Sequence, residues 1–219
     1  KMLTVQNDEL MVEEKGIHSI EKFLIARRLM YSQVYLHKTV LSSELMLMNI
    51  LRRAKWLVQQ GETLFATPSL SYFLTHAFNE KSFLEDEQCL HYFLDLDDSD
   101  IVSAIKVWAN HDDKILSDIC QRLVDRSLFK VHFLEKEDTD FRESVQQTIL
   151  QSMPISLEEL SYYYIEDTIH SNTYNEKEEA IKIMFKSGKI KNISEVENSL
   201  IAEGLLVPIK KPYICFLRN

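Results

Sequence analysis

The chain has 219 residues, of which 25 are Lys or Arg and 34 are Asp or Glu, so its formal net charge at pH 7 is −9. Hydrophobic residues make up 45% and charged residues 27%, which excludes intrinsic disorder; four glycines and four prolines exclude collagen-like and low-complexity sequences. The acidic balance argues against general binding to nucleic acids, which uses clustered Lys and Arg. Any anionic ligand therefore needs a local basic pocket.

The chain termini and cysteines indicate the cellular compartment. The first residue is Lys1 rather than Met, which favours a fragment or a processed chain. Residues 1–16 contain no apolar signal-peptide core, and no stretch approaches the roughly 18 apolar residues of a membrane span. Because Cys89, Cys120 and Cys215 are far apart and form no CxxC pair, we expect no disulfide framework or zinc site. The prediction is a cytoplasmic protein that does not contact membranes.

The N-terminal part is predicted to be a β-hairpin followed by helices. Two short alternating runs, Leu3–Val5 and Leu10–Val12, flank Asn7-Asp8 as the strands of a hairpin do. No Pro or Gly interrupts residues 17–60, whose pattern indicates one very long helix or two helices in line. Further helices are predicted over residues 70–78, 83–93, 101–109 and 114–125, with starts at Thr67-Pro68-Ser69, at acidic caps, at Ser99 or Asp100, and at Asp113.

The pattern changes near residue 126, where predicted strands begin to alternate with helices. The predicted elements are strand 128–134, helix 141–151, strands 162–169 and 180–185, helix 194–202 and strand 212–217. This order is that of a split βαβ, ferredoxin-like unit. The predicted fold class is α+β, with a hairpin and mainly helical domain over residues 1–125 and a small α+β domain over residues 126–219.

A helical wheel of residues 17–60 places cations among apolar residues. Arg27, Tyr31 and Lys38 fall within the arc of the predicted core, with Tyr35 and His37 near its edges. That predicted core consists of Ile20, Phe23, Leu24, Leu41 and Leu45. Because buried cations need an anion, one interpretation is a pocket for a phosphorylated ligand, with tyrosines beside its base or sugar. The alternative is that the cations pair with carboxylates or extend to the surface.

One stretch of this helical region is more specific. GIHSIEKFLIARR, continued three residues later by YSQVYLHKTV, resembles the helix that follows the metal site in HD-domain deoxynucleoside triphosphate triphosphohydrolases. The shared pattern is Arg, Tyr or His four residues later, Tyr eight residues later, and Tyr-x-His-Lys. The resemblance implies that Arg27 contacts the triphosphate and that Tyr35 packs near the deoxyribose and disfavours a 2′-hydroxyl. The other implied substrate-binding residues are Tyr31, His37 and Lys38.

A second, shorter match lies at the predicted domain boundary. Arg126-Ser127-Leu128-Phe129-Lys130 is similar to an Arg-x-Leu-Phe-Lys segment of the same family. The resemblance implies that Arg126 and Lys130 touch an allosteric nucleotide at a subunit interface. The alternative is a strand whose two basic ends reach solvent.

The family's metal centre uses a His, a His-Asp pair and a later Asp, which would all precede the hairpin. The resemblance therefore implies a divalent metal ion bound by residues upstream of this segment, with no metal ligand or catalytic residue within it. The pair His111-Asp112 lies between two predicted helices, where a capping role fits better than a metal site.

The resemblance identifies the chain as the C-terminal portion of an HD-type phosphohydrolase. The implied reaction is the hydrolysis of a dNTP to a deoxynucleoside and triphosphate by the full-length protein, and the segment alone is expected to be inactive. Expected partners are the dNTP substrate, a missing N-terminal HD half, and like subunits in a homo-oligomer. The alternative function is a non-catalytic helical module that assembles subunits.

Overall fold

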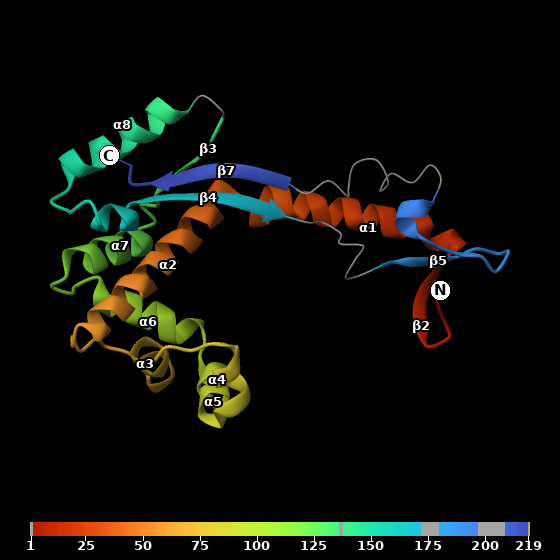
Figure 1. Ribbon diagram of the computed structural model, residues 1–219, viewed down its shortest axis with the longest axis horizontal. Coiled ribbons are helices and arrows are strands. Elements are labelled where there is room, and N and C mark those ends of the chain that lie inside the picture. The colour runs from red at the N-terminus through yellow and green to blue at the C-terminus, as the bar shows by residue number, and fades with distance from the viewer. Residues whose placement is uncertain (1, 136–137, 172–179, 197–208, 219) are drawn as a thin grey trace. The chain divides into compact units, whose positions relative to one another are not determined.

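The computed structural model describes residues 2–135, 138–171, 180–196 and 209–218 (Figure 1). The chain divides into two compact units, and each is described by itself. The first unit comprises residues 1–40, 133–135 and 166–213, and the second comprises residues 41–132, 136–165 and 214–219. Each unit contains segments from both sides of residue 125, so the units divide the chain differently from the predicted domains.

The first unit begins with the predicted hairpin. Strands β1 (Leu3–Gln6) and β2 (Glu9–Glu13) pair in antiparallel register. Asn7 and Asp8 have φ angles of 52° and 59°, the left-handed conformation that both central residues of a type I′ turn require. Strand β2 then pairs in parallel with β5 (Lys182–Met184), which is antiparallel to β6 (Ile190–Asn192), in the order β1-β2-β5-β6.

Helix α1 (Ile17–Met30), which follows a short 3-10 turn (Glu14–Gly16), contributes to the core of this unit. The buried cluster consists of Val12, Leu24, Ile183 and Ile193. Gly16 lies close to this packing, because a Cβ atom there would be 2.7 Å from Cγ1 of Val12. Phe23 was predicted to lie in the core but is 59% exposed. The core instead contacts the face of α1 that carries Ile17, Ile20 and Leu24.

The helical region over residues 17–60 is two helices, as the second interpretation stated. Between α1 and α2 (Lys38–Gln59) lies a π-helical turn, η2 (Tyr31–Tyr35), in which the Leu36 amide donates to the Tyr31 carbonyl at 2.8 Å. At the start of α2, the amide of Thr39 donates to Nδ1 of His37 at 3.2 Å. The imidazole thus caps α2, and the wheel of one continuous helix does not apply across this junction.

The second unit is mainly helical, and aspartates set its helix boundaries. One helix was predicted over residues 83–93, but Asp86 divides this region into two helices. The amide of Asp86 makes the last hydrogen bond of the first helix, and its carboxylate accepts from the amide of Gln88 at 2.9 Å at the start of the second. Asp97 caps a later helix in place of the predicted Ser99 or Asp100, and Asp113 is the predicted cap. The helices after α2 are α3 (Pro68–Thr75), α4 (Glu80–Glu85), α5 (Glu87–Asp95), α6 (Asp98–Trp108) and α7 (Lys114–Val124).

The two tryptophans of this unit lie in different environments. Trp108 is buried in the core, where its Nε1 donates to the Phe65 carbonyl at 3.0 Å. Trp56, by contrast, is 42% exposed. The cysteines are free and buried, and burial raises the pKa of Cys120 and of Cys215 to about 12. Both thiols are therefore protonated and poorly nucleophilic at neutral pH.

Strands β3 (Lys130–Phe133), β7 (Ile209–Phe216) and β4 (Tyr164–Ser171) form a three-stranded sheet in the order β3-β7-β4, and α8 (Thr139–Ser152) follows β3 in the chain. The α+β class, a helical part with a smaller α+β part, is confirmed. In the expected ferredoxin-like arrangement, the predicted strands would share one sheet. Within the described ranges, β5 instead pairs with β2, because Ile183 enters the core that contains Val12.

Most of the predicted helix 194–202 lies outside the described residues, which show a 3-10 turn at Ile193–Glu195. Among the helices that the structure describes, none combines the length and apolar character needed to cross a membrane.

Candidate functional site

Arg27, Tyr31 and Tyr35 lie together on the exposed face of α1 and η2. The Arg27 guanidinium carbon lies 5.6 Å from the centroid of the Tyr31 ring, and the rings of Tyr31 and Tyr35 are 5.2 Å apart. The three side chains line a hollow of about 370 Å³. Its other lining residues are Phe23, Ala26 and Met30. π-Helical turns such as η2 are frequent at functional sites, which favours this hollow as a candidate.

The charge of Arg27 is available to a ligand. The side chain is exposed rather than part of the buried arc, and among the described residues it forms no ion pair. The wheel placed Arg27 among buried residues, but the side chain extends to the surface, as the alternative interpretation stated, and its contact with Tyr31 positions the guanidinium. A planar guanidinium beside two tyrosine rings can bind a phosphate and contact a sugar or base.

The two remaining residues of the predicted substrate segment lie elsewhere. His37 caps α2 through Nδ1, and Nζ of Lys38 lies 5.1 Å from the centroid of the Phe133 ring. Neither residue lines the hollow that contains Arg27. The structure thus brings together three of the five residues in one hollow, and His37 and Lys38 lie outside it.

The predicted allosteric residues are also separated. Arg126 is exposed and follows α7 with a φ of 57°, the left-handed conformation common just after a helix end. Lys130 lines a hollow of about 280 Å³ whose polar members also include Ser144, Thr148 and Arg218. Arg126 does not line that hollow, and the assignment of an effector nucleotide to these two residues stays a prediction.

The pair His111-Asp112 does not form a metal site. Nδ1 of His111 accepts a hydrogen bond from the amide of Asp113 at 3.0 Å, and Asp113 itself caps α7. Within the part of the chain that the structure describes, no three His, Cys, Asp or Glu side chains are grouped so that they could hold a metal ion. These residues do not fit the divalent ion of an HD enzyme, and no metal-dependent step is assigned to them.

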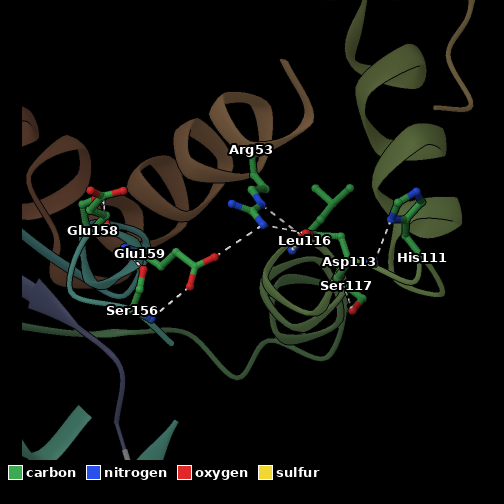
Figure 2. Close-up of polar contacts among 9 residues, drawn as sticks. Arg53, His111, Asp113, Leu116, Ser117, Ser156, Glu158 and Glu159 are labelled. Carbon is green, nitrogen blue, oxygen red and sulfur yellow. Dashed lines mark hydrogen bonds and ion pairs between the residues drawn. The ribbon is translucent and has the colours of Figure 1, made fainter. Parts of the chain in front are cut away.

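A buried arginine that the sequence analysis missed lies nearby. Nε and Nη2 of Arg53 donate to the two carboxylate oxygens of Asp113 at 3.1 and 2.6 Å, and Nη2 is 3.6 Å from Oε1 of Glu159 (Figure 2). Its guanidinium carbon also lies 4.3 Å from the ring centroid of Trp56. Arg53 thereby joins α2, the start of α7 and the 3-10 turn η3 (Glu159–Tyr162).

The charges of this ion pair stabilise each other. Burial alone would lower the pKa of Arg53, but the hydrogen bonds and charge of Asp113 outweigh it, so this pKa lies above its ordinary value. Burial alone would raise the pKa of Asp113, but hydrogen bonds from Arg53 and the Leu116 amide hold it below its ordinary value. The spacing of Met46, Ile50 and Arg53 on one face of α2 is the signal that could have placed Arg53 in the core.

A larger hollow of about 770 Å³ lies between α2 and residues 156–162, but its cations already have partners. Arg53 pairs with Asp113, Nη2 of Arg52 donates to the Ser161 carbonyl at 2.8 Å, and Nζ of Lys55 donates to the His76 carbonyl at 2.8 Å. A ligand there would compete with these contacts. The hollow at Arg27 is therefore the better candidate for binding an anion.

Comparisons with known proteins show what this chain is similar to. Residues 1–66 match the family model of the HD associated region, and this range contains α1, η2 and all of α2. A solved phosphohydrolase from Bacteroides thetaiotaomicron superposes with a TM-score of 0.87 and 44% identity, covering 100% of this chain and 54% of that protein. The N-terminal residues are thus similar to an HD-associated region, and the whole chain is similar in sequence and fold to part of a phosphohydrolase.

Two further relatives are more distant. The uncharacterized protein YwfO of Bacillus subtilis is 29% identical over 217 residues, which are 94% of this chain and 46% of that protein. A solved hypothetical protein from Aquifex aeolicus shares the fold, with a TM-score of 0.59 and 24% identity over 99% of this chain and 46% of that one. The chain thus spans about half the length of the curated relatives that it matches.

Proposed function

We propose that this chain supplies the phosphate- and sugar-binding surface of a metal-dependent HD-type phosphohydrolase that converts dNTPs to deoxynucleosides and triphosphate. The observation that carries the proposal is the hollow of Arg27, Tyr31 and Tyr35, which lies within the HD-associated residues 1–66. The similarity to a phosphohydrolase over the whole chain supports the reaction class.

In this proposal the present chain binds the substrate, and another part of the protein catalyses the hydrolysis. Arg27 contacts the triphosphate, Tyr31 and Tyr35 contact the nucleoside, and Lys38 adds a second cation to the same segment. The divalent metal ion is assigned to an N-terminal HD half, as the resemblance to HD-domain triphosphohydrolases implies. We further propose that this half, or a like subunit of a homo-oligomer, covers the exposed Phe23.

The test is Arg27→Ala in a full-length protein that includes the metal-binding half. Loss of a contact that stabilises phosphate charge lowers kcat/KM for a dNTP by roughly 10²-fold or more. Arg28→Ala is the matched control, because Arg28 has the same charge one residue away but does not line the hollow. Unchanged kinetics for Arg27→Ala would remove it from the mechanism and favour the alternative, a non-catalytic assembly module.

A further inference from the structure

Helices α3, α4 and α5 of the second unit are neighbours (Figure 1), and aromatic rings make contacts between them. Tyr72 of α3 stacks on Tyr92 of α5 with ring centroids 4.5 Å apart, and its hydroxyl donates to Asp86 at 2.7 Å. Phe93 of α5 contacts Phe83 of α4 edge-on at 5.4 Å. Contacts of this kind give the three helices a fixed relative geometry. The three helices therefore form a packed platform, which positions the side chains on its surface.

The outer surface of this platform is apolar. Four large side chains of α4 and α5, named here the α5 patch, are exposed to 81%, 44%, 54% and 72%: Leu84, Leu90, Phe93 and Leu94. The last three have the spacing i, i+3 and i+4, so they share one face of α5. Single exposed apolar residues need no explanation, but several on one helix face mark a candidate interaction site.

The charge around the patch is strongly negative. Residues 80–98 contain seven Asp or Glu residues and one lysine, Lys81. Most of these carboxylates are exposed, and the exposed set includes Glu85, Glu87 and Asp95. Nucleic acids and anionic membranes would be repelled here, and two copies joined through the same patch would bring like charges together. A partner must therefore combine an apolar stripe with flanking cations.

We propose that the α5 patch binds a basic amphipathic helix of a partner protein. Apolar side chains of that helix, spaced i, i+3, i+4 and i+7, pack against Leu90, Phe93 and Leu94, and its Lys or Arg residues lie opposite Glu87 and Asp95. The patch lies outside the HD-associated residues 1–66 and contains none of the proposed substrate contacts. The inference therefore does not depend on the proposed hydrolase function.

The probe is a labelled synthetic peptide of about 18 residues, built from Leu and Lys in an amphipathic helical pattern. Its fluorescence anisotropy is titrated with the full chain. The double variant Leu90→Ser/Leu94→Ser raises the Kd about tenfold or more, as removal of central apolar contacts does. Leu157→Ser is the matched control, because Leu157 is 75% exposed elsewhere on the second unit, and this variant binds as wild type does. A peptide with Glu in place of Lys does not bind.

A charge reversal tests the same proposal without touching an apolar residue. Glu87→Lys/Asp95→Lys weakens binding of the Lys peptide and strengthens binding of the Glu peptide, while circular dichroism shows that the fold is kept. The proposal is overturned if the leucine variant binds like wild type, or if the Glu peptide binds wild type as tightly as the Lys peptide. It is also overturned if light scattering shows that the patch joins two copies, through a dimer that Leu94→Ser dissolves.

Discussion

Arg27 and Arg53 each lie over the ring of an aromatic residue one helical turn later, yet the two arginines occupy opposite environments. Arg27 is exposed, stacks on Tyr31 and forms no ion pair with the residues that the structure describes. Arg53 is buried, stacks near Trp56 and forms a bidentate pair with Asp113. Both guanidinium groups therefore contact an aromatic ring. The carboxylate partner is what distinguishes an arginine that holds the fold from one that can bind a ligand.

The difference follows from the cost of burying charge. A buried guanidinium needs a counter-ion and filled hydrogen bonds, and Asp113 and Glu159 supply them to Arg53. An exposed guanidinium stays hydrated, so it can exchange water for phosphate oxygens at little cost. We therefore interpret Arg53 as a structural residue and Arg27 as a binding residue.

The largest expected effect tests the structural half of this comparison. Arg53→Ala leaves the Asp113 carboxylate buried without its partner and lowers the free energy of unfolding by about 3–5 kcal/mol. Arg27→Ala changes it by no more than about 0.5 kcal/mol, as an exposed substitution does. Urea unfolding followed by the fluorescence of the buried Trp108 measures both values.

A double variant sharpens this result. Arg53→Met/Asp113→Asn removes both charges while the asparagine can still cap α7, so it loses less stability than Arg53→Ala alone. Equal losses in the two variants would show that the packing of Arg53 against Trp56, rather than its charge pair, is the main contribution.

A smaller effect follows from the lowered pKa of Asp113. The folded chain holds this carboxylate ionised at pH values where the unfolded chain, with a pKa of about 3.9, takes up a proton. The stabilisation is therefore fully present above that value and is lost as the pH falls through the folded-state pKa. A charge-assisted hydrogen bond contributes about 1.5–3 kcal/mol, which bounds the loss.

Unfolding free energies of wild type and Asp113→Asn, measured from about pH 5 downward, test this expectation. The wild type loses stability more steeply, because the variant has no proton to bind at this position. Parallel curves would mean that other carboxylates control acid unfolding. The pair of Asp113 with Arg53 would then contribute little to the pH dependence of the unfolding free energy.

The comparison also shows what the sequence could predict. The hairpin at Asn7-Asp8 and the cap at Asp113 depend on neighbouring residues, and local patterns predicted them correctly. The pairing of β5 with β2 joins segments about 170 residues apart, and nothing in either short strand specifies its partner. Long-range pairing is decided by which apolar faces fit together, here those of Val12 and Ile183.

The candidate site shows a similar division. The cluster of Arg27, Tyr31 and Tyr35 was predictable from their spacing of four residues. The separate position of Lys38 was not, because the π-helical turn and the cap by His37 interrupt the wheel that related Lys38 to Arg27. A wheel assumes a constant rotation per residue, and one wider turn followed by a break removes that relation.

The smallest expected effect concerns the sugar of the proposed substrate. If the Tyr35 ring packs against the 2′ position of a bound dNTP, it leaves no room for the hydroxyl of an NTP. Tyr35→Ala removes that obstacle. It lowers the ratio of kcat/KM for a dNTP to kcat/KM for the NTP, by about tenfold if the contact is worth about 1.4 kcal/mol. Tyr35→Phe is the matched control and keeps the ratio, because the ring excludes the hydroxyl and the phenol oxygen does not. Equal loss of activity on both substrates in Tyr35→Ala would show that Tyr35 only supports Tyr31, whose ring lies 5.2 Å away.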